Sequence, residues 1–143
     1  MRWVATGVFF VCIFLATPTV RADTYKYAVV VGNNVGQESA KALRYAQSDA
    51  HKLFDVLIDN GGFDPKHSAL LLGKDAPSVW KQVRTVEKQI QRDKRKGHSI
   101  VFLFYFSGHA EGDTLQMGKT EMGFERVRDF LEYSAAEDRK SVV

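Results

Sequence analysis

Three apolar runs separated by amphipathic segments constrain the fold of this 143-residue chain more than any other feature. The runs cover residues 27–31, 69–72 and 99–106, and each is followed by glycine or by Ser-Gly. Strands of a parallel sheet have such continuous apolar sequences, because helices cover both faces of the sheet. We therefore predict three strands of a mostly parallel sheet. The most hydrophobic run, 99–106, is predicted to be its central strand.

Helical periodicity fills the intervals between these runs. Apolar residues recur at helical spacing over about 41–59, from Pro77 to Ile90, and over 124–131. Residues 112–123 lack a clear period and predict a short hairpin around 114–117. Strands that alternate with amphipathic helices predict an α/β fold, a three-layer sandwich with a mostly parallel sheet.

The final residues, 141–143, resemble the start of another strand. A helix in this kind of fold leads back to the sheet, so we expect the sheet to be incomplete at the C-terminus. The strand 99–106 would then expose backbone donors and acceptors along an apolar edge. This predicts that the chain by itself expresses poorly and aggregates through that strand.

The N-terminus has the pattern of a cleavable secretion signal. A basic start at Arg2 precedes an apolar stretch, and Val20-Arg21-Ala22 suits signal peptidase. A membrane anchor is the alternative, but the apolar run is shorter than the roughly 20 residues of a bilayer span. We expect residues 1–22 to be a signal peptide, residues 23–143 to be the exported domain, periplasmic or extracellular, and no membrane contact after cleavage.

Charge and cysteine content exclude several classes of function. The formal net charge of +3 includes Arg2 and Arg21, so the mature chain is almost neutral. Acidic residues are interspersed among the basic side chains of residues 81–96, and no aromatic platform accompanies them. This predicts a solvated face and no nucleic-acid partner. The only cysteine, Cys12, lies in the signal. Residues 23–143 therefore hold no disulfide, cysteine metal site or cysteine nucleophile.

Two strand ends carry residues suited to chemistry, because functional groups of open α/β sheets collect where strands end. These ends are Gly32-Asn33-Asn34 and Ser107-Gly108-His109-Ala110. A histidine after a buried strand is held rigidly and reaches the crevice, as a general base requires. Its spacing alone leaves a catalytic and a structural role for His109 equally open. The other three histidines are poor catalytic candidates: His51, His67 and His98.

Four segments in the expected order resemble the caspase-like cysteine peptidases of the metacaspase and bacterial orthocaspase branch. They are Tyr27-Ala-Val-Val-Val-Gly-Asn-Asn, Leu43-Arg-Tyr-Ala-Gln-Ser-Asp-Ala, Gly61-Gly-Phe and Phe104-Tyr-Phe-Ser-Gly-His-Ala. The resemblance covers residues 25–143. It implies that His109 is catalytic and pairs with a cysteine at the end of the next parallel strand, beyond this chain.

The resemblance also implies an activity and a specificity. The parent protein would be a cysteine endopeptidase acting on proteins or peptides, and this fragment alone would be inactive. Asp49 matches a carboxylate that selects Arg or Lys before the cut, although it also suits the first turn of a helix. Ala110 replaces a glycine of many relatives, which weakens the expected oxyanion contribution there. The loop after His109 offers only two acidic residues, Glu111 and Asp113, and no dense acidic cluster that could bind a cation. We therefore expect no metal, and we expect no cofactor.

Two other functions remain open from the sequence. A non-catalytic exported domain could keep the fold and use the crevice for binding, in which case the missing strand would end in a residue other than cysteine. A nucleotide-binding module is suggested by Val-Val-Val-Gly-Asn-Asn-Val-Gly between a strand and a helix. That segment lacks the third glycine and the phosphate-binding lysine of stronger motifs.

Overall fold

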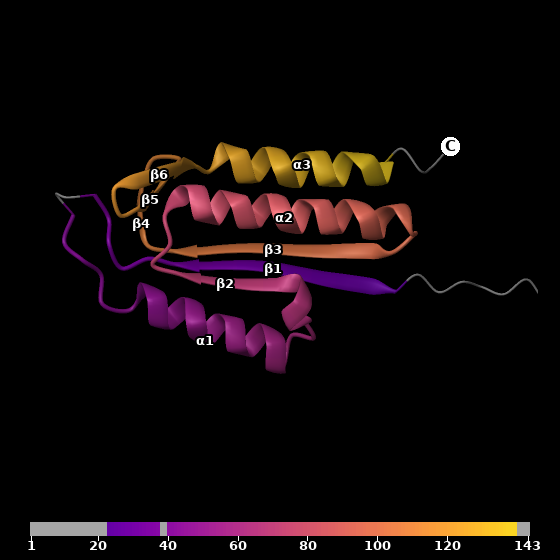
Figure 1. Ribbon diagram of the computed structural model, residues 1–143, viewed down its shortest axis with the longest axis horizontal. Helices are drawn as coiled ribbons and strands as arrows, with labels where there is room; N and C mark the ends of the chain where they lie inside the picture. Colours follow the sequence, from indigo (N-terminus) through magenta and orange to yellow (C-terminus); the bar gives the residue numbers. More distant parts are fainter. Residues whose placement is uncertain (1–22, 38–39, 140–143) are drawn as a thin grey trace, which may run out of the picture.

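The computed structural model describes residues 23–37 and 40–139. Its main sheet consists of three parallel strands, β1 (Thr24–Gly32), β2 (Ser68–Leu72) and β3 (Ser99–Ser107), in the order β2-β1-β3. Two successive strand–helix–strand connections build this sheet (Figure 1). The predicted signal peptide and the predicted strand at 141–143 lie outside the described residues.

Helices cover both faces of the sheet. Helix α1 (Ala46–Asp59) packs on one face, whereas α2 (Ala76–Arg95) and α3 (Glu125–Arg139) lie on the other (Figure 1). A short 3-10 helix, η1 (Pro65–His67), precedes β2. The predicted three-layer α/β sandwich is confirmed. No helix within the described ranges is long and apolar enough to cross a membrane.

The middle of the sheet is β1, whose residues 27–31 are completely buried. The prediction that 99–106 is the central strand is therefore wrong for the described sheet. Among the described strands β3 pairs with β1 alone, and its side chains are mostly only partly buried. The reason is topological: the connection through α2 crosses β1 and places β3 on the far side from β2. The hydrophobicity of a strand indicates that helices cover it, but it does not indicate the position of the strand in the sheet.

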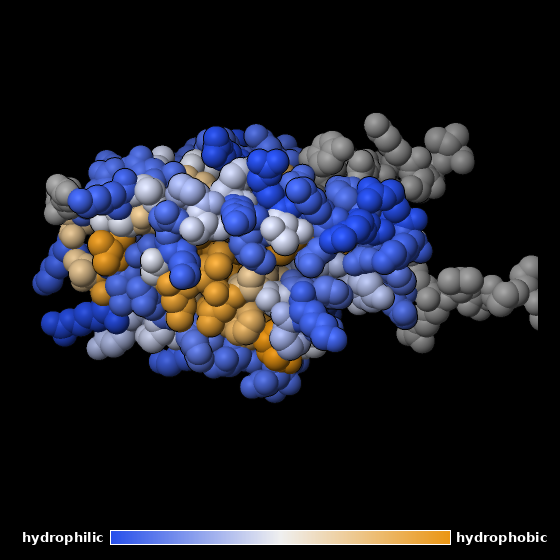
Figure 2. Space-filling model, viewed as in Figure 1, coloured by the Kyte–Doolittle hydropathy of each residue, from blue (hydrophilic) through white to orange (hydrophobic). Residues whose placement is uncertain are grey.

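Apolar side chains are exposed beside this edge of the sheet. Figure 2 shows them gathered across the middle of one face, at the level that the sheet occupies in Figure 1. A groove of about 350 Å³ runs between β3 and α3, and its lining includes Val101, Leu103, Phe124 and Leu131. Val101 is 44% exposed although it belongs to the most hydrophobic run. The β3 edge is thus an apolar surface open to solvent.

A second, antiparallel sheet follows β3. It consists of β4 (His109–Glu111), β5 (Thr114–Met117) and β6 (Thr120–Gly123), in that order. The predicted hairpin around 114–117 is thus part of a three-stranded meander. Gly112 and Gly118 form its turns with positive φ angles of 56° and 65°, a backbone conformation that favours glycine.

The first helix begins at Ala46, later than the predicted start near residue 41. The N-cap residue, Tyr45, provides no side-chain hydrogen bond. Asn34 takes this role: its Oδ1 accepts from Gln47 N at 3.0 Å and its carbonyl accepts from Leu43 N at 2.7 Å. Because the Leu43 amide is bonded to Asn34 after β1, it has no helical partner and the helix begins only at Ala46, even though Leu43 fits the apolar period.

Tyrosines and histidines pack together at the amino end of the sheet. The ring of Tyr25 stacks on His98 with centroids 4.4 Å apart, and the ring of Tyr27 stacks on His67 at 4.6 Å. The Tyr27 hydroxyl donates to the carboxylate of Asp93 on α2. Burial and this carboxylate raise the pKa of Tyr27, and the hydrogen bond from Tyr27 lowers the pKa of Asp93. His67 and His98 therefore lie far along the sheet from His109.

Replacing Tyr27 by phenylalanine is expected to lower the free energy of unfolding by about 1–2 kcal/mol at pH 7, because Asp93 loses its hydroxyl donor. The pKa of Asp93 is lowered in the folded state. The contribution of this carboxylate is therefore present at neutral pH and is lost as the pH falls below about 4. Urea unfolding at pH 7 and pH 3 measures the difference. A deficit that is equal at both pH values would contradict this account.

Candidate functional site

The three parallel strands end together and form the platform of the site. Gly32 is in register with Leu72 of β2 and Ser107 of β3. Beyond these residues, Gly73 N donates to Gly32 O at 2.8 Å and Asn33 N donates to Ser107 O at 2.9 Å. Loops from all three strands therefore leave the sheet at one edge, where functional groups of such folds collect.

Asn33 fixes the loops at this edge. It is only 4% exposed, and its Nδ2 donates to Lys74 O at 3.1 Å. Its Oδ1 accepts from Val35 N at 3.0 Å. The side chain thus joins the ends of β1 and β2 and sets the course of the loop toward Gly36. A buried amide with its hydrogen bonds satisfied is a rigid support.

Gly32 allows the first turn of α1 to touch β1. A Cβ at this position would lie 2.7 Å from Ala50 Cβ and 2.8 Å from both Ala46 O and Gln47 Cα. Two of these three contacts are to helix backbone, which cannot rotate away. Glycine is therefore required for the close approach that holds the start of α1, with Asp49, at the carboxyl end of the sheet.

His109 is the first residue of β4 and pairs with Gln116 of β5. Its half-buried ring packs against Gly36 in the loop after β1. A Cβ at Gly36 would lie 2.6 Å from His109 Cδ2 and 2.8 Å from Cγ. The imidazole is consequently held between the meander and the loop after β1, and its orientation depends on the absence of a side chain at residue 36.

The Nε2 atom of His109 is buried and makes no hydrogen bond to any residue that the structure describes. A buried polar atom without a partner costs about 1–3 kcal/mol. Such atoms are rare in native proteins and often belong to catalytic groups. A fixed imidazole with one unpaired nitrogen at the ends of parallel strands can accept a proton from a nucleophile and return it to a leaving group.

The second predicted residue, Asp49, lies in the first turn of α1 and is exposed. Asp49 and His109 share one end of the sheet, but His109 is packed inward and Asp49 faces solvent, so they do not form one buried cluster. The neighbouring His51 is also exposed, with Nδ1 3.0 Å from Asp55 Oδ2. An exposed carboxylate at this end can receive a cationic side chain of a ligand.

Sequence reasoning missed the roles of Gly36 and Asn33. Gly36 entered only as part of a glycine pattern suggestive of nucleotide binding. In the structure it seats the His109 ring, and Val35 N, which could otherwise face a phosphate, donates to Asn33. The signal in the sequence was the segment 32–36 after the buried run 27–31, which contains two asparagines and two glycines in five positions. The histidine that packs against Gly36, His109 of β4, is more than 70 residues away in the sequence.

These features define an α/β domain with a half-buried imidazole at the carboxyl end of its parallel sheet. The protein family described as the caspase domain matches residues 25–135. This match covers well over half of the chain, and the chain belongs to the caspase domain family, a family of cysteine peptidases. No curated protein and no solved structure matches the chain at a significant level.

Proposed function

We propose that this chain carries the catalytic histidine of a caspase-like cysteine endopeptidase of the metacaspase and orthocaspase branch. The observation that carries the proposal is the buried, unpaired Nε2 of His109, held over Gly36 at the ends of the parallel strands. Residues 23–143 contain no cysteine. The nucleophile is therefore proposed to belong to a segment of the parent protein outside this range.

The apolar edge of β3 supports a place for that segment. A further parallel strand paired with β3 would cover Val101 and the groove between β3 and α3. Its carboxyl end would then lie beside the ends of β1 and β3, near His109. A cysteine there would lose its proton to the imidazole, attack the scissile carbonyl carbon, and form a thioester as the protonated imidazole gives its proton to the leaving amine. Water then hydrolyses the thioester.

Asp49 is proposed to bind the basic side chain that precedes the scissile bond. Its carboxylate is exposed in the first turn of α1, at the same end of the sheet as His109. A carboxylate can accept two parallel hydrogen bonds from a guanidinium group. The substrates would then be peptides cut after Arg or Lys, and Arg would bind more tightly than Lys.

Asp49→Asn in the full-length parent protein is expected to lower kcat/KM for Arg-terminated peptides by about 10-fold to 100-fold, the value of a charged hydrogen bond. Hydrolysis of fluorogenic Arg-, Lys- and Asp-terminated peptides measures the change. Asp55→Asn, an exposed carboxylate on the same helix, is the matched control and should have no effect. Preference for Asp-terminated peptides would refute the proposed specificity. The absence of hydrolysis of any peptide would refute the proposed activity.

Export is proposed from the sequence of residues 1–22. The mature protein, expressed from its own signal and isolated from the periplasm or medium, should begin at Asp23 when its mass is measured. A mass that retains Met1, or protein recovered only from the membrane, would show that the segment is not cleaved and acts as an anchor.

A further inference from the structure

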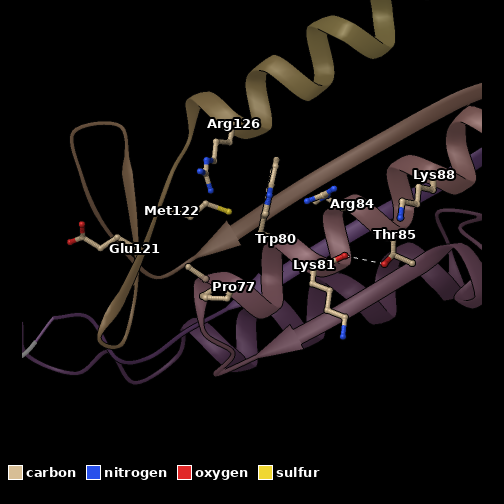
Figure 3. Close-up of a pocket in the computed structure, with 10 residues that line it drawn as sticks. Pro77, Trp80, Lys81, Arg84, Thr85, Lys88, Glu121, Met122 and Arg126 are labelled. Carbon is tan, nitrogen blue, oxygen red and sulfur yellow. Dashed lines mark hydrogen bonds between the residues drawn. The ribbon is translucent and has the colours of Figure 1, made fainter.

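A hollow of about 580 Å³ lies on the α2 side of the molecule, between α2, the start of α3 and β6 (Figure 3). This volume is in the range of ligand-binding pockets. Four cationic side chains and an apolar base characterise its lining. The residues that matter are Trp80, Lys81, Arg84, Lys88, Met122 and Arg126.

The cations form a row rather than a ring. Lys81, Arg84 and Lys88 are exposed on α2 at helical spacing, so they extend about 10 Å along its axis. Arg126 approaches from α3, with its guanidinium carbon 5.6 Å from the centre of the Trp80 ring. Glu121, the one acidic residue in the described lining, accepts a hydrogen bond from Gln37 and points away from the hollow (Figure 3). The hollow therefore has a strong excess of positive charge.

An aromatic platform accompanies this charge. Trp80 is half-buried and stands near the centre of the view in Figure 3, and Met122 beside it is 2% exposed. Trp80 precedes Arg84 by one turn of α2 and Lys88 by two. The prediction that the basic face of α2 has no aromatic platform is therefore wrong. Trp80 directly precedes the basic stretch 81–96 in the sequence and lies on the same helix.

We propose that this hollow binds an acidic peptide segment that carries one aromatic or long aliphatic side chain. Successive cations of the row are separated by rises of about 4.5 and 6 Å along the helix, close to the about 6.6 Å between alternate residues of an extended peptide. Alternate carboxylates can therefore pair with Lys81, Arg84 and Lys88. The apolar side chain packs on Trp80, which Met122 supports from beneath, beside Arg126.

The arrangement favours a peptide over a nucleic acid. Single-stranded nucleic acids are bound by several aromatic side chains that stack successive bases, whereas Trp80 is the only aromatic residue of the described lining. The hollow is two strands from His109 within the meander, since Glu121 pairs with Gln116 and Gln116 pairs with His109. This places a bound segment about 10 Å from the strand of the candidate catalytic histidine. Binding there is independent of the proposed peptidase chemistry, because no residue of the hollow takes part in it.

Fluorescence anisotropy of a labelled peptide, Glu-Asp-Phe-Glu-Asp-Glu, with the full chain tests the proposal. The double reversal Arg84→Glu with Lys88→Glu should weaken binding by about tenfold or more, because two ion pairs become repulsive contacts. The matched control, Lys41→Glu with Lys52→Glu, makes the same charge change on exposed residues near and on α1 and should leave binding unchanged. Trp80→Phe should leave the binding of this peptide within about threefold, since an aromatic platform remains.

Three results would overturn the proposal. The first is equal loss of affinity in both double reversals, which would indicate only a general attraction of charge. The second is equal affinity for the neutral peptide Gln-Asn-Phe-Gln-Asn-Gln, or no measurable binding of the acidic one. The third is tighter binding of an oligothymidylate of eight nucleotides that depends on Arg84 and Lys88, which would assign the hollow to nucleic acid.

Discussion

His109→Ala in the full-length parent protein is expected to lower kcat/KM for Arg- and Lys-terminated peptides by about 1,000-fold, within the range of general acid–base catalysis. Among the described residues, only His109 has a buried ring nitrogen without a hydrogen-bond partner, and it lies where the strands end. In the proposed mechanism, loss of the imidazole would leave the thiol protonated and the leaving amine without a proton donor. Initial rates at saturating and limiting peptide concentrations measure the change.

His51→Ala is the control for this substitution. His51 is exposed on α1 and pairs with Asp55, so its loss should change the rate by less than twofold and the stability slightly. Thermal unfolding of both variants separates a chemical effect from a folding effect. Equal rates in wild type and His109→Ala, with both proteins folded, would remove His109 from the mechanism.

Gly36→Ala is expected to lower kcat by about 100-fold with a much smaller change in KM. The added methyl group would lie 2.6 Å from His109 Cδ2, so the imidazole must move by several tenths of an ångström or more. Misplacement of a catalytic group by about 1 Å can reduce the rate by two orders of magnitude. Asp49, which is proposed to bind the basic side chain of the substrate, belongs to α1 and is not among the nearest neighbours of Gly36, so substrate binding should be largely retained.

The adjacent substitution Val35→Ala is the matched control for Gly36→Ala. Val35 is 53% exposed in the same loop, and its backbone hydrogen bonds to Asn33 and Gly118 do not involve its side chain. Its kcat should equal that of wild type. An unchanged kcat in Gly36→Ala, measured on folded protein, would mean that the ring can shift without consequence and that the described packing does not position the base.

The layers of the fold could be predicted because local patterns determine them. Residues 27–31 form an uninterrupted apolar run and are completely buried in β1, and Val79, Val83, Val86 and Ile90 form the buried stripe of α2. Helices on both faces of a parallel sheet follow from this alternation. Strand order does not, because it depends on which side of β1 each connection reaches.

The position of His109 after the end of β3 could be predicted, but the contacts that hold it could not. The position of His109 after an apolar strand indicated a group at the edge of the sheet, and the caspase domain match agrees with the resemblance that suggested its role. The contacts that hold it are long-range. Asn34 caps α1 from outside the helix, and Gly36 meets a ring 73 positions later in the chain. Such pairs have no local period, so a single sequence does not reveal them.

The most direct test of the central claim is the rate at which iodoacetamide alkylates the parent protein at pH 6, with the modified residue located by mass spectrometry. The account predicts one rapidly modified cysteine outside residues 23–143, and a rate about 100-fold lower in His109→Ala, because only a neighbouring imidazolium keeps the thiol ionised at that pH. A rate that is the same in both proteins, or a parent protein with no such cysteine, would contradict the assignment of His109 to a cysteine peptidase site.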